Sequence, residues 1–137
     1  MAKVSMSTQL SVPADELWKM IGGFNALPDW HPGVEKSELA DGGRQRTLQL
    51  AGGGTIVETL VSQDDGSKTY TYEIKDSPLP VANYVSTINV SPSGEKTSTV
   101  EWSSNFEASG APENEAVKAI QDMYQTGLDN LKKMYGG

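Results

Sequence analysis

The C-terminal part of the chain constrains the fold most, because it predicts one long amphipathic helix that must be buried against another layer. Pro112, Glu113 and Glu115 favour a helix start, and Lys132 and Lys133 suit the negative end of the helix dipole. The apolar residues of this segment form one broad stripe: Val117, Ile120, Met123, Tyr124, Leu128, Leu131 and Tyr135. The preceding residues therefore have to supply the surface that covers the stripe.

Short runs of alternating apolar and polar residues precede this helix, and a period of two is typical of half-buried strands. The runs are Val4–Val12, Val34–Leu39, Arg44–Leu50, Ile56–Val61, Thr69–Ile74, Tyr84–Val90 and Val100–Phe106. Turn-forming segments follow several of them, namely Asp41-Gly42-Gly43, Asp64-Asp65-Gly66 and Pro92-Ser93-Gly94. This order predicts an α+β fold with six or seven antiparallel strands and helices on one face.

Two short helical segments are predicted after the first strand. Pro13 suits the first position of a helix, whose apolar face is Leu17, Trp18 and Ile21 and which ends at Gly22-Gly23. Residues 24–30 can add one further helical turn. A sheet wrapped around the C-terminal helix would enclose a pocket, and His31 is expected near its mouth.

Size and charge exclude several kinds of partner. The chain has 137 residues, and we expect residues 1–137 to form one domain. Its 18 acidic and 11 basic residues give a net charge of -7, which argues against nucleic acid as a partner. No apolar run approaches the roughly 20 residues that span a bilayer. The N-terminal residues lack the apolar core of a signal peptide, so we expect a cytoplasmic protein.

The same composition bears on cofactors. Cysteine is absent, which excludes a disulfide framework, a thiolate nucleophile and a cysteine-based metal site. A single histidine argues against a tight transition-metal site, and Gly52-Gly53-Gly54 lacks the Lys-Ser/Thr of a phosphate-binding loop. We therefore expect neither a metal nor an organic cofactor.

His31 is the first candidate for chemistry, because it is the one side chain that titrates near neutral pH. Its neighbours Trp30 and Pro32 place it on a constrained turn. The alternative is a surface or loop histidine beside a core tryptophan, and the sequence does not decide between the two.

Glu58 and Arg46 are charged residues within apolar patterns. Glu58 shares a face with Ile56 and Leu60, and a carboxylate on an inner face has to be paired or solvated. The alternative places Glu58 on the outer face of the sheet. Arg46 shares a face with Leu48 and could neutralise Glu58 or an anionic ligand, although an exposed arginine along the strand is the preferred interpretation.

Aromatic residues and one glycine complete the candidates. Tyr72, Tyr84 and Trp102 offer apolar rings with one hydrogen-bonding group each, and aromatics are also normal core residues. Gly127 lies in the apolar stripe of the long helix, where glycine costs roughly 1 kcal/mol relative to alanine. A glycine there leaves room either for a ligand or for close packing.

Taken in order, five segments resemble the SRPBCC superfamily, in particular its polyketide cyclase/dehydrase-like branch of small bacterial proteins. They are Val12–Val34, Gly54–Leu60, Tyr70–Ile74, Pro78–Tyr84 and Val100–Ser103, and the resemblance covers nearly the whole chain. It implies a helix-grip fold, in which a strongly curved antiparallel sheet surrounds the last helix and a large, mostly apolar cavity lies between them. Members bind lipids, sterols, hormones and polyketides, and some are cyclases.

The chain is also distantly similar to the plant abscisic-acid receptors. That similarity places residues 52–55 near their gate loop and residues 78–80 near their latch loop. It places Glu58, Tyr84 and Ser86 at ligand-facing positions, and Gly127 where the receptors have a polar ligand contact. His31 replaces a lysine that meets the hormone's carboxylate, so recognition of the same acid is not implied.

These observations lead to one expected function and two alternatives. The expected protein is a monomer or homodimer that binds a small hydrophobic molecule (a lipid, polyketide or aromatic metabolite) in an internal cavity. The residues expected to contact this ligand are His31, Arg46, Glu58, Tyr72, Tyr84, Ser86, Trp102 and Gly127. The first alternative is a polyketide cyclase or dehydratase that uses His31 as a proton shuttle, with Glu58 or Tyr84 polarising a carbonyl. The second is a partner-binding or regulatory protein whose cavity is vestigial.

Overall fold

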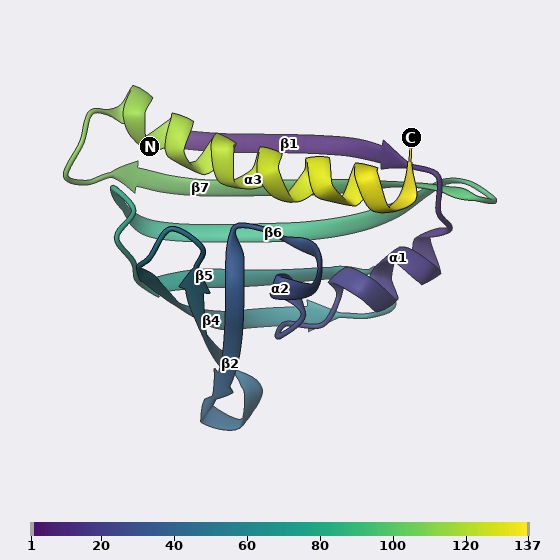
Figure 1. Ribbon diagram of the computed structural model, residues 1–137, viewed down its shortest axis with the longest axis horizontal. Coiled ribbons are helices and arrows are strands. Elements are labelled where there is room, and N and C mark those ends of the chain that lie inside the picture. The colour runs from purple at the N-terminus through teal and green to yellow at the C-terminus, as the bar shows by residue number, and fades with distance from the viewer. Residues whose placement is uncertain (1, 137) are drawn as a thin grey trace.

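Residues 2–136, which the computed structural model describes, form an antiparallel sheet with helices on one face (Figure 1). The sheet has seven strands in the order β1-β7-β6-β5-β4-β3-β2. The strands are β1 (Ala2–Leu10), β2 (Val34–Ala40), β3 (Gln45–Leu50), β4 (Thr55–Asp64), β5 (Thr69–Asp76), β6 (Val81–Gly94) and β7 (Thr97–Ala108). The helices are α1 (Ala14–Ile21), α2 (Leu27–Trp30) and α3 (Glu113–Tyr135), with a short 3-10 turn, η1, at Asp41–Gly43. The predicted α+β fold, with two short helices after the first strand, is confirmed.

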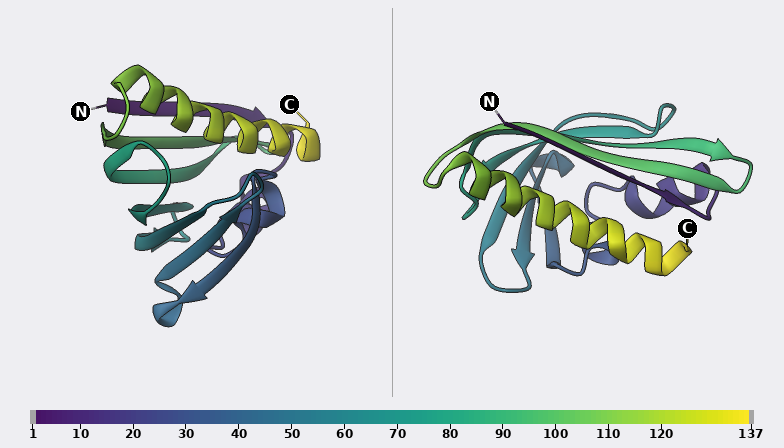
Figure 2. Two further views of the ribbon diagram at one scale, coloured as in Figure 1. Left: turned by 60° about the vertical axis from the view of Figure 1, so that its left-hand side comes forward. Right: turned by 90° about the horizontal axis from the view of Figure 1, so that it is seen from above.

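The sheet curves strongly, and α3 lies along its inner side (Figure 2). Helix α3 packs mainly on β1 and β7, at one edge of the sheet, while β2 and β3 curl around at the other edge. The helix-grip arrangement that the resemblance implied is therefore present. The space between α3 and the middle strands is occupied by side chains of the core, which include those of α1 and α2.

The stripe of α3 is buried as its spacing predicted. The buried residues are Ala116, Ile120, Tyr124, Gly127, Leu128 and Leu131, while Val117, Met123 and Tyr135 are partly buried. Pro112 takes the position before the first helical turn rather than within it. The helix thus presents a continuous apolar face with one gap at Gly127, where no side chain projects toward the sheet.

Helix α1 is fixed to the turn between β4 and β5. Leu17 and Ile21 are fully buried, and the indole N–H of Trp18 donates to Asp65 at 3.1 Å. The helix ends at Gly22, where the ring of Trp18 covers the position that a side chain would occupy. Close packing, rather than a left-handed backbone, therefore explains this glycine.

One predicted turn is wrong. Residues 92–94 were expected to form a turn, but β6 continues to Gly94 and the reversal falls at residues 95–96. Pro92 pairs with Ser98 on β7, next to a register shift, and β5 pairs with β6 no further than Asn89. Pro92 therefore has a neighbouring strand on one side only. Such edge positions are where a strand tolerates proline.

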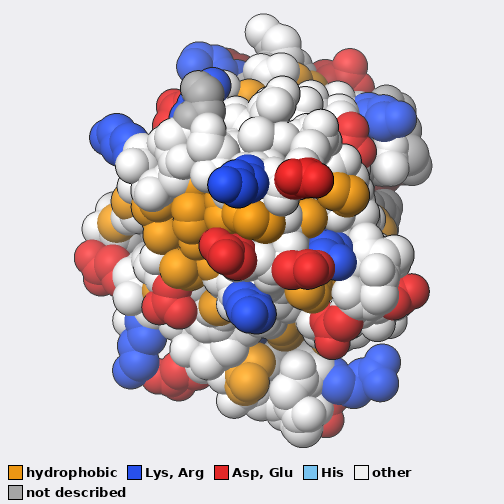
Figure 3. Space-filling model, turned by 90° about the vertical axis from the view of Figure 1, so that its right-hand side faces the viewer, with side chains coloured by type: hydrophobic (Ala, Val, Ile, Leu, Met, Phe, Trp, Pro, Cys, Tyr) orange, Lys and Arg blue, Asp and Glu red, His pale blue; other side chains and the backbone are white. Residues whose placement is uncertain are grey.

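The surface carries charges of both signs. Figure 3 shows the face at the α1 end of the molecule, where hydrophobic side chains form a patch among acidic and basic ones. Among residues 2–136, no helix is long and apolar enough to cross a membrane. Within the same residues, no three His, Asp or Glu side chains come together as metal ligands would.

Candidate functional site

His31 caps the end of α2 and joins that region to α3. Its Nε2–H donates to the backbone carbonyl of Met123 at 2.7 Å, and its Nδ1 accepts from the backbone N–H of Gly33 at 3.0 Å. This pattern requires the neutral tautomer with the proton on Nε2. The imidazole is buried, so a surface position for His31 is wrong, although the neighbouring Trp30 is the core residue that this alternative expected.

The imidazole of His31 also fills the gap at Gly127. A β-carbon built on Gly127 would lie 2.7 Å from Cδ2 of His31, with ring atoms of Trp30 and Trp102 at 3.0 and 3.1 Å. Gly127 therefore allows close packing of side chains against the helix, rather than leaving room for a ligand. His31 meets Trp102 edge-on, with their ring centres 6.0 Å apart.

Burial lowers the pKa of His31, and the hydrogen bond to the Met123 carbonyl opposes this shift only in part. The imidazole is therefore uncharged at neutral pH. Because both ring nitrogens already have partners, His31 could accept a proton only by giving up the hydrogen bond from Gly33. The folded geometry holds this side chain in place more than it activates it.

A pocket of about 240 Å³ lies beside His31, between α3 and the ends of β2 and β3. Its lining consists of His31, Gly33, Val34, Leu50, Asp122, Met123 and Thr126. Val34, Leu50 and Met123 give it largely apolar walls, and Asp122 and Thr126 are exposed residues of α3. This pocket has the composition typical of a small-molecule site, with apolar walls and few polar groups.

Arg46 and Glu58 form a buried ion pair across β3 and β4. Nε and Nη2 of Arg46 each lie 2.7 Å from Oε1 of Glu58, and Nη1 donates to the backbone carbonyl of Phe24. Neither side chain is appreciably exposed. The exposed position preferred for Arg46 and the outer-face alternative for Glu58 are therefore wrong, whereas the pairing of the two is confirmed.

Aromatic rings enclose the guanidinium of Arg46. Its central carbon lies 4.1 Å from the ring centre of Phe24 and 5.1 Å from that of Tyr72. Burial opposes the charge of Arg46, but the Glu58 carboxylate outweighs it and raises the pKa of Arg46. The arginine is therefore charged, and Glu58 is its counter-charge inside the core.

The hydroxyl groups of three tyrosines converge between the sheet and α3, and we call them the tyrosine cluster (Tyr72, Tyr84 and Tyr124). The Tyr84 hydroxyl is hydrogen-bonded to that of Tyr124 and lies 3.5 Å from that of Tyr72. Ser86 joins the cluster through Tyr124, at 2.9 Å. The indole N–H of Trp102 is shared between the Tyr72 hydroxyl, at 3.0 Å, and Ser86, at 3.1 Å.

These phenols stay protonated. Burial raises the pKa of Tyr72 and of Tyr84 well above the ordinary value, and raises the pKa of Tyr124 to about 12. The tyrosine cluster therefore consists of neutral hydroxyl groups, which both donate and accept hydrogen bonds. The ring of Trp102 stacks on Tyr124 with ring centres 4.2 Å apart, so Trp102 separates the cluster from His31.

The structure thus divides the predicted site residues into three groups. His31, Gly127 and Trp102 lie together next to the pocket. Tyr72, Tyr84 and Ser86 belong to the hydrogen-bonded network deeper in the core. Arg46 and Glu58 form an ion pair between β3 and β4.

Several residues of the site were not predicted as such. Tyr124 was recognised only as part of the apolar stripe, and the Met123 carbonyl, Val34 and Leu50 were not considered. A signal for Tyr124 did exist, because a tyrosine three residues before Gly127 lies on the same helix face. The backbone carbonyl of Met123 leaves no trace in the sequence.

The two loops placed near the receptors' gate and latch lie side by side. Gly54 has a φ of +101°, and a β-carbon built on it would lie 3.4 Å from Cγ of Pro78 and 3.8 Å from Leu50. Leu50 in turn lines the pocket beside His31. The contact between the loops therefore adjoins this pocket.

A curved seven-stranded antiparallel sheet around a long C-terminal helix is the helix-grip fold of the START superfamily. The chain belongs to the polyketide cyclase/dehydrase and lipid transport family, whose model matches residues 1–136.

Solved structures support this assignment. The protein XoxI from Bacillus cereus is 39% identical, with a TM-score of 0.97 over 98% of this chain and 96% of that one. A protein from Bacillus thuringiensis is also 39% identical, with a TM-score of 0.95 over 97% of this chain and 98% of that one. The Zhui aromatase/cyclase from a Streptomyces species is 16% identical, with a TM-score of 0.79 over 97% and 92%, and shows the fold alone. The comparison with curated proteins found no match.

Proposed function

We propose that the protein binds a small hydrophobic molecule in the pocket beside His31. The observation that carries this proposal is the apolar wall formed by Val34, Leu50 and Met123 where α3 meets the ends of β2 and β3. Burying apolar surface there stabilises a complex by about 25 cal/mol per Å². The family's description, which includes lipid transport, supports the same kind of ligand.

The size of the pocket restricts the ligand. At about 240 Å³ it lies below the range of about 300–1,000 Å³ that is typical of drug-sized ligands. A monocyclic or bicyclic aromatic metabolite, or one end of a lipid or polyketide, suits this volume. Asp122 and Thr126 stand at its exposed side, where a polar group of the ligand would remain in contact with water.

The predicted residues that lie deeper in the core can contact a ligand only if His31 moves. Trp102 lies behind His31 and donates its N–H to Tyr72 and Ser86. A ligand that displaced the imidazole would meet Trp102 first and the tyrosine cluster next. Tyr84 would then orient a carbonyl or hydroxyl group of the ligand, while Arg46 and Glu58 would keep their role as a counter-charged pair.

Native mass spectrometry of the protein purified from its own host tests the proposal, followed by denaturing extraction of any bound molecule. We expect one recurring small hydrophobic compound on the wild-type protein. Thr126→Trp, which fills the pocket from its exposed side, should lose this compound. Lys133→Trp, an exposed residue of the same helix outside the pocket, is the matched control and should retain it. Equal retention by both variants would contradict the proposed site.

An enzyme of the cyclase or dehydratase class is the second candidate, and the tyrosine cluster favours it. Neutral phenol groups that converge on one point can stabilise the oxygen of a carbonyl as it becomes an enol. His31 would supply the proton transfer after releasing Gly33. With a poly-β-carbonyl thioester as substrate, His31→Ala should lower the rate of cyclisation by about 10²–10⁴-fold if His31 is the base. An unchanged rate would remove His31 from the mechanism.

A further inference from the structure

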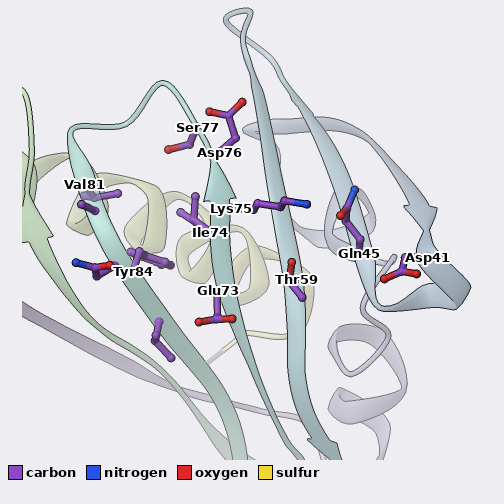
Figure 4. A pocket seen from close by; sticks show the side chains of 13 residues that line it. Asp41, Gln45, Thr59, Glu73, Ile74, Lys75, Asp76, Ser77, Val81 and Tyr84 are labelled. Atoms are coloured by element: carbon purple, nitrogen blue, oxygen red, sulfur yellow. The ribbon is translucent and has the colours of Figure 1, made fainter.

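A groove of about 780 Å³ lies on the outer face of the sheet, away from α3 (Figure 4). It extends over β3, β4, β5 and β6, and polar side chains make up most of its lining. Gln45, Thr59, Glu73 and Lys75 are among them, and Figure 4 shows them on the side of the sheet that faces the viewer. This groove is separate from the pocket beside His31, with which it shares no lining residue.

The sheet is open beneath this groove. Strands β5 and β6 pair from Thr69 and Asn89 as far as Glu73 and Val85, and the pairing stops there although both strands continue. Residues 74–76 of β5 and 81–84 of β6 therefore do not pair with each other, and each segment has ladder partners on its other side only, in β4 and β7 respectively. We call this unpaired stretch the β5–β6 opening.

The opening has a local cause in β6. The pairing of β6 with β7 shifts register between Ala82 and Val85, and Asn83 within this bulge has a φ of +54°. The side-chain amide of Asn83 donates to the carboxylate of Glu107 on β7 at 3.0 Å. This end of β6 is therefore held against β7, and a bulge bends the strand that carries it.

Two side chains close the opening. In Figure 4 the side chains of Ile74, from β5, and Tyr84, from β6, project into the space between the two strands. Both residues line the outer groove, although Tyr84 is almost completely buried. The hydroxyl of Tyr84 is hydrogen-bonded to Tyr124 in the core. One residue, Tyr84, thus connects the outer groove with the tyrosine cluster.

We infer that the β5–β6 opening is a second binding site, which takes an amphiphile with an uncharged, hydroxylated head group. The apolar tail passes between β5 and β6 by displacing Ile74 and Tyr84 and reaches the core. The head group stays in the outer groove. This site does not depend on the proposed function of the pocket beside His31.

The chemistry of the groove selects the head group. The unpaired edges of β5 and β6 present N–H donors and C=O acceptors that no ladder satisfies, and hydroxyl groups complement both. Gln45, Thr59 and Ser77 add uncharged polar groups. The charged lining residues are three acids (Asp41, Glu73 and Asp76) and one base (Lys75), which disfavours an anionic head group.

The test is calorimetric titration with decyl maltoside below its micellar concentration, with decyl sulfate as the anionic comparison. Because the chain has no cysteine, Lys75→Cys/Asn83→Cys introduces a unique pair across the opening, which a short bis-maleimide can bridge. The bridged protein should bind decyl maltoside at least about tenfold more weakly than the same variant before bridging. Thr71→Cys/Thr87→Cys, bridged with the same reagent where the strands already pair and outside the lining of the groove, should change affinity by less than about twofold.

Amide chemical shifts separate this site from the pocket beside His31. Decyl maltoside should perturb Thr59, Lys75 and Val85, and leave Val34 and Met123 unchanged. Equal affinity before and after bridging, tighter binding of decyl sulfate, or the absence of binding to the wild-type protein would each overturn the inference. None of these outcomes bears on ligand binding beside His31.

Discussion

The imidazole of His31 occupies the space that the absent side chain of Gly127 leaves on α3, although the two residues lie 96 positions apart in the sequence. The imidazole cannot retreat freely, because Met123 and Gly33 hold both of its nitrogens. The glycine, in turn, exposes the helix surface on which the ring packs. This pair fixes the α2–β2 segment to α3, and His31 forms part of the wall of the pocket.

Gly127→Ala is therefore expected to destabilise the protein, although alanine is the better helix former by roughly 1 kcal/mol. The new methyl group would lie 2.7 Å from the His31 ring, and overpacking of this kind costs about 1–3 kcal/mol. In a His31→Ala background the same substitution should cost less, because only the contacts with Trp30 and Trp102, at 3.0 and 3.1 Å, remain. Urea denaturation of the four proteins in this cycle measures the coupling, and strictly additive effects would contradict the packing described.

The stability of the protein should fall as the pH is lowered through the ordinary titration range of histidine. Burial lowers the pKa of His31, so between its folded value and about 6.5 the unfolded chain binds the additional proton. The contribution is complete above pH 6.5 and is lost as the pH falls toward the folded pKa. Comparing the free energy of unfolding at pH 7.5 and 5 with that of His31→Asn isolates this contribution.

The same claim can be checked directly, because the chain has one histidine. The imidazole resonances in an NMR titration should show a midpoint below 6.5, where an unperturbed histidine titrates. A midpoint at or above 6.5 would contradict the burial of the ring, which is what lowers its pKa.

Removal of one partner of the buried ion pair should be costly. Glu58→Gln leaves the guanidinium of Arg46 without its counter-charge in the core, which costs about 3–5 kcal/mol. The double replacement Arg46→Met/Glu58→Leu should cost much less than the sum of the single ones. Glu38→Gln is the control, since the Lys36–Glu38 pair is well exposed and its loss should not be measurable. A small effect of Glu58→Gln would show that the pair is hydrated.

The indole N–H of Trp102 has two hydrogen-bond acceptors. The losses of stability caused by removing them should not be additive. Tyr72→Phe and Ser86→Ala each leave one acceptor for the indole N–H, and each should cost about 1 kcal/mol. The double variant leaves a buried donor without a partner, which adds about 1–3 kcal/mol beyond the sum. Denaturation followed by tryptophan fluorescence measures the three variants. An additive result would indicate that water replaces the missing acceptors.

The fold could be predicted because its signals are local. The stripe on α3 and the alternation in the strands each repeat many times, so a single misplaced turn, such as that at Pro92, does not alter the topology. The resemblance supplied the curvature of the sheet, which periodicity alone does not contain. A pairing of Arg46 with Glu58 could be considered in advance because both interrupt apolar faces of neighbouring strands, although the sequence favoured an exposed arginine.

The details of the site could not be predicted, because they depend on contacts between distant parts of the chain. The partner of His31 is a backbone carbonyl 92 residues away, and backbone groups are identical in every sequence. Tyr124 appeared as one more apolar stripe residue, since only the register of α3 against β6 brings its hydroxyl to Tyr84. The opening between β5 and β6 follows from a bulge at Asn83 that no pattern marks.

The central claim, that a small hydrophobic molecule binds beside His31, is tested most directly by methyl NMR spectra during titration with 2-naphthol. We predict saturable shifts of the methyl groups of Val34, Leu50 and Met123 and of the His31 ring, with other methyl groups unchanged. These shifts should be abolished in Thr126→Trp and retained in Lys133→Trp. Saturable shifts that map elsewhere, or that persist in Thr126→Trp, would contradict it.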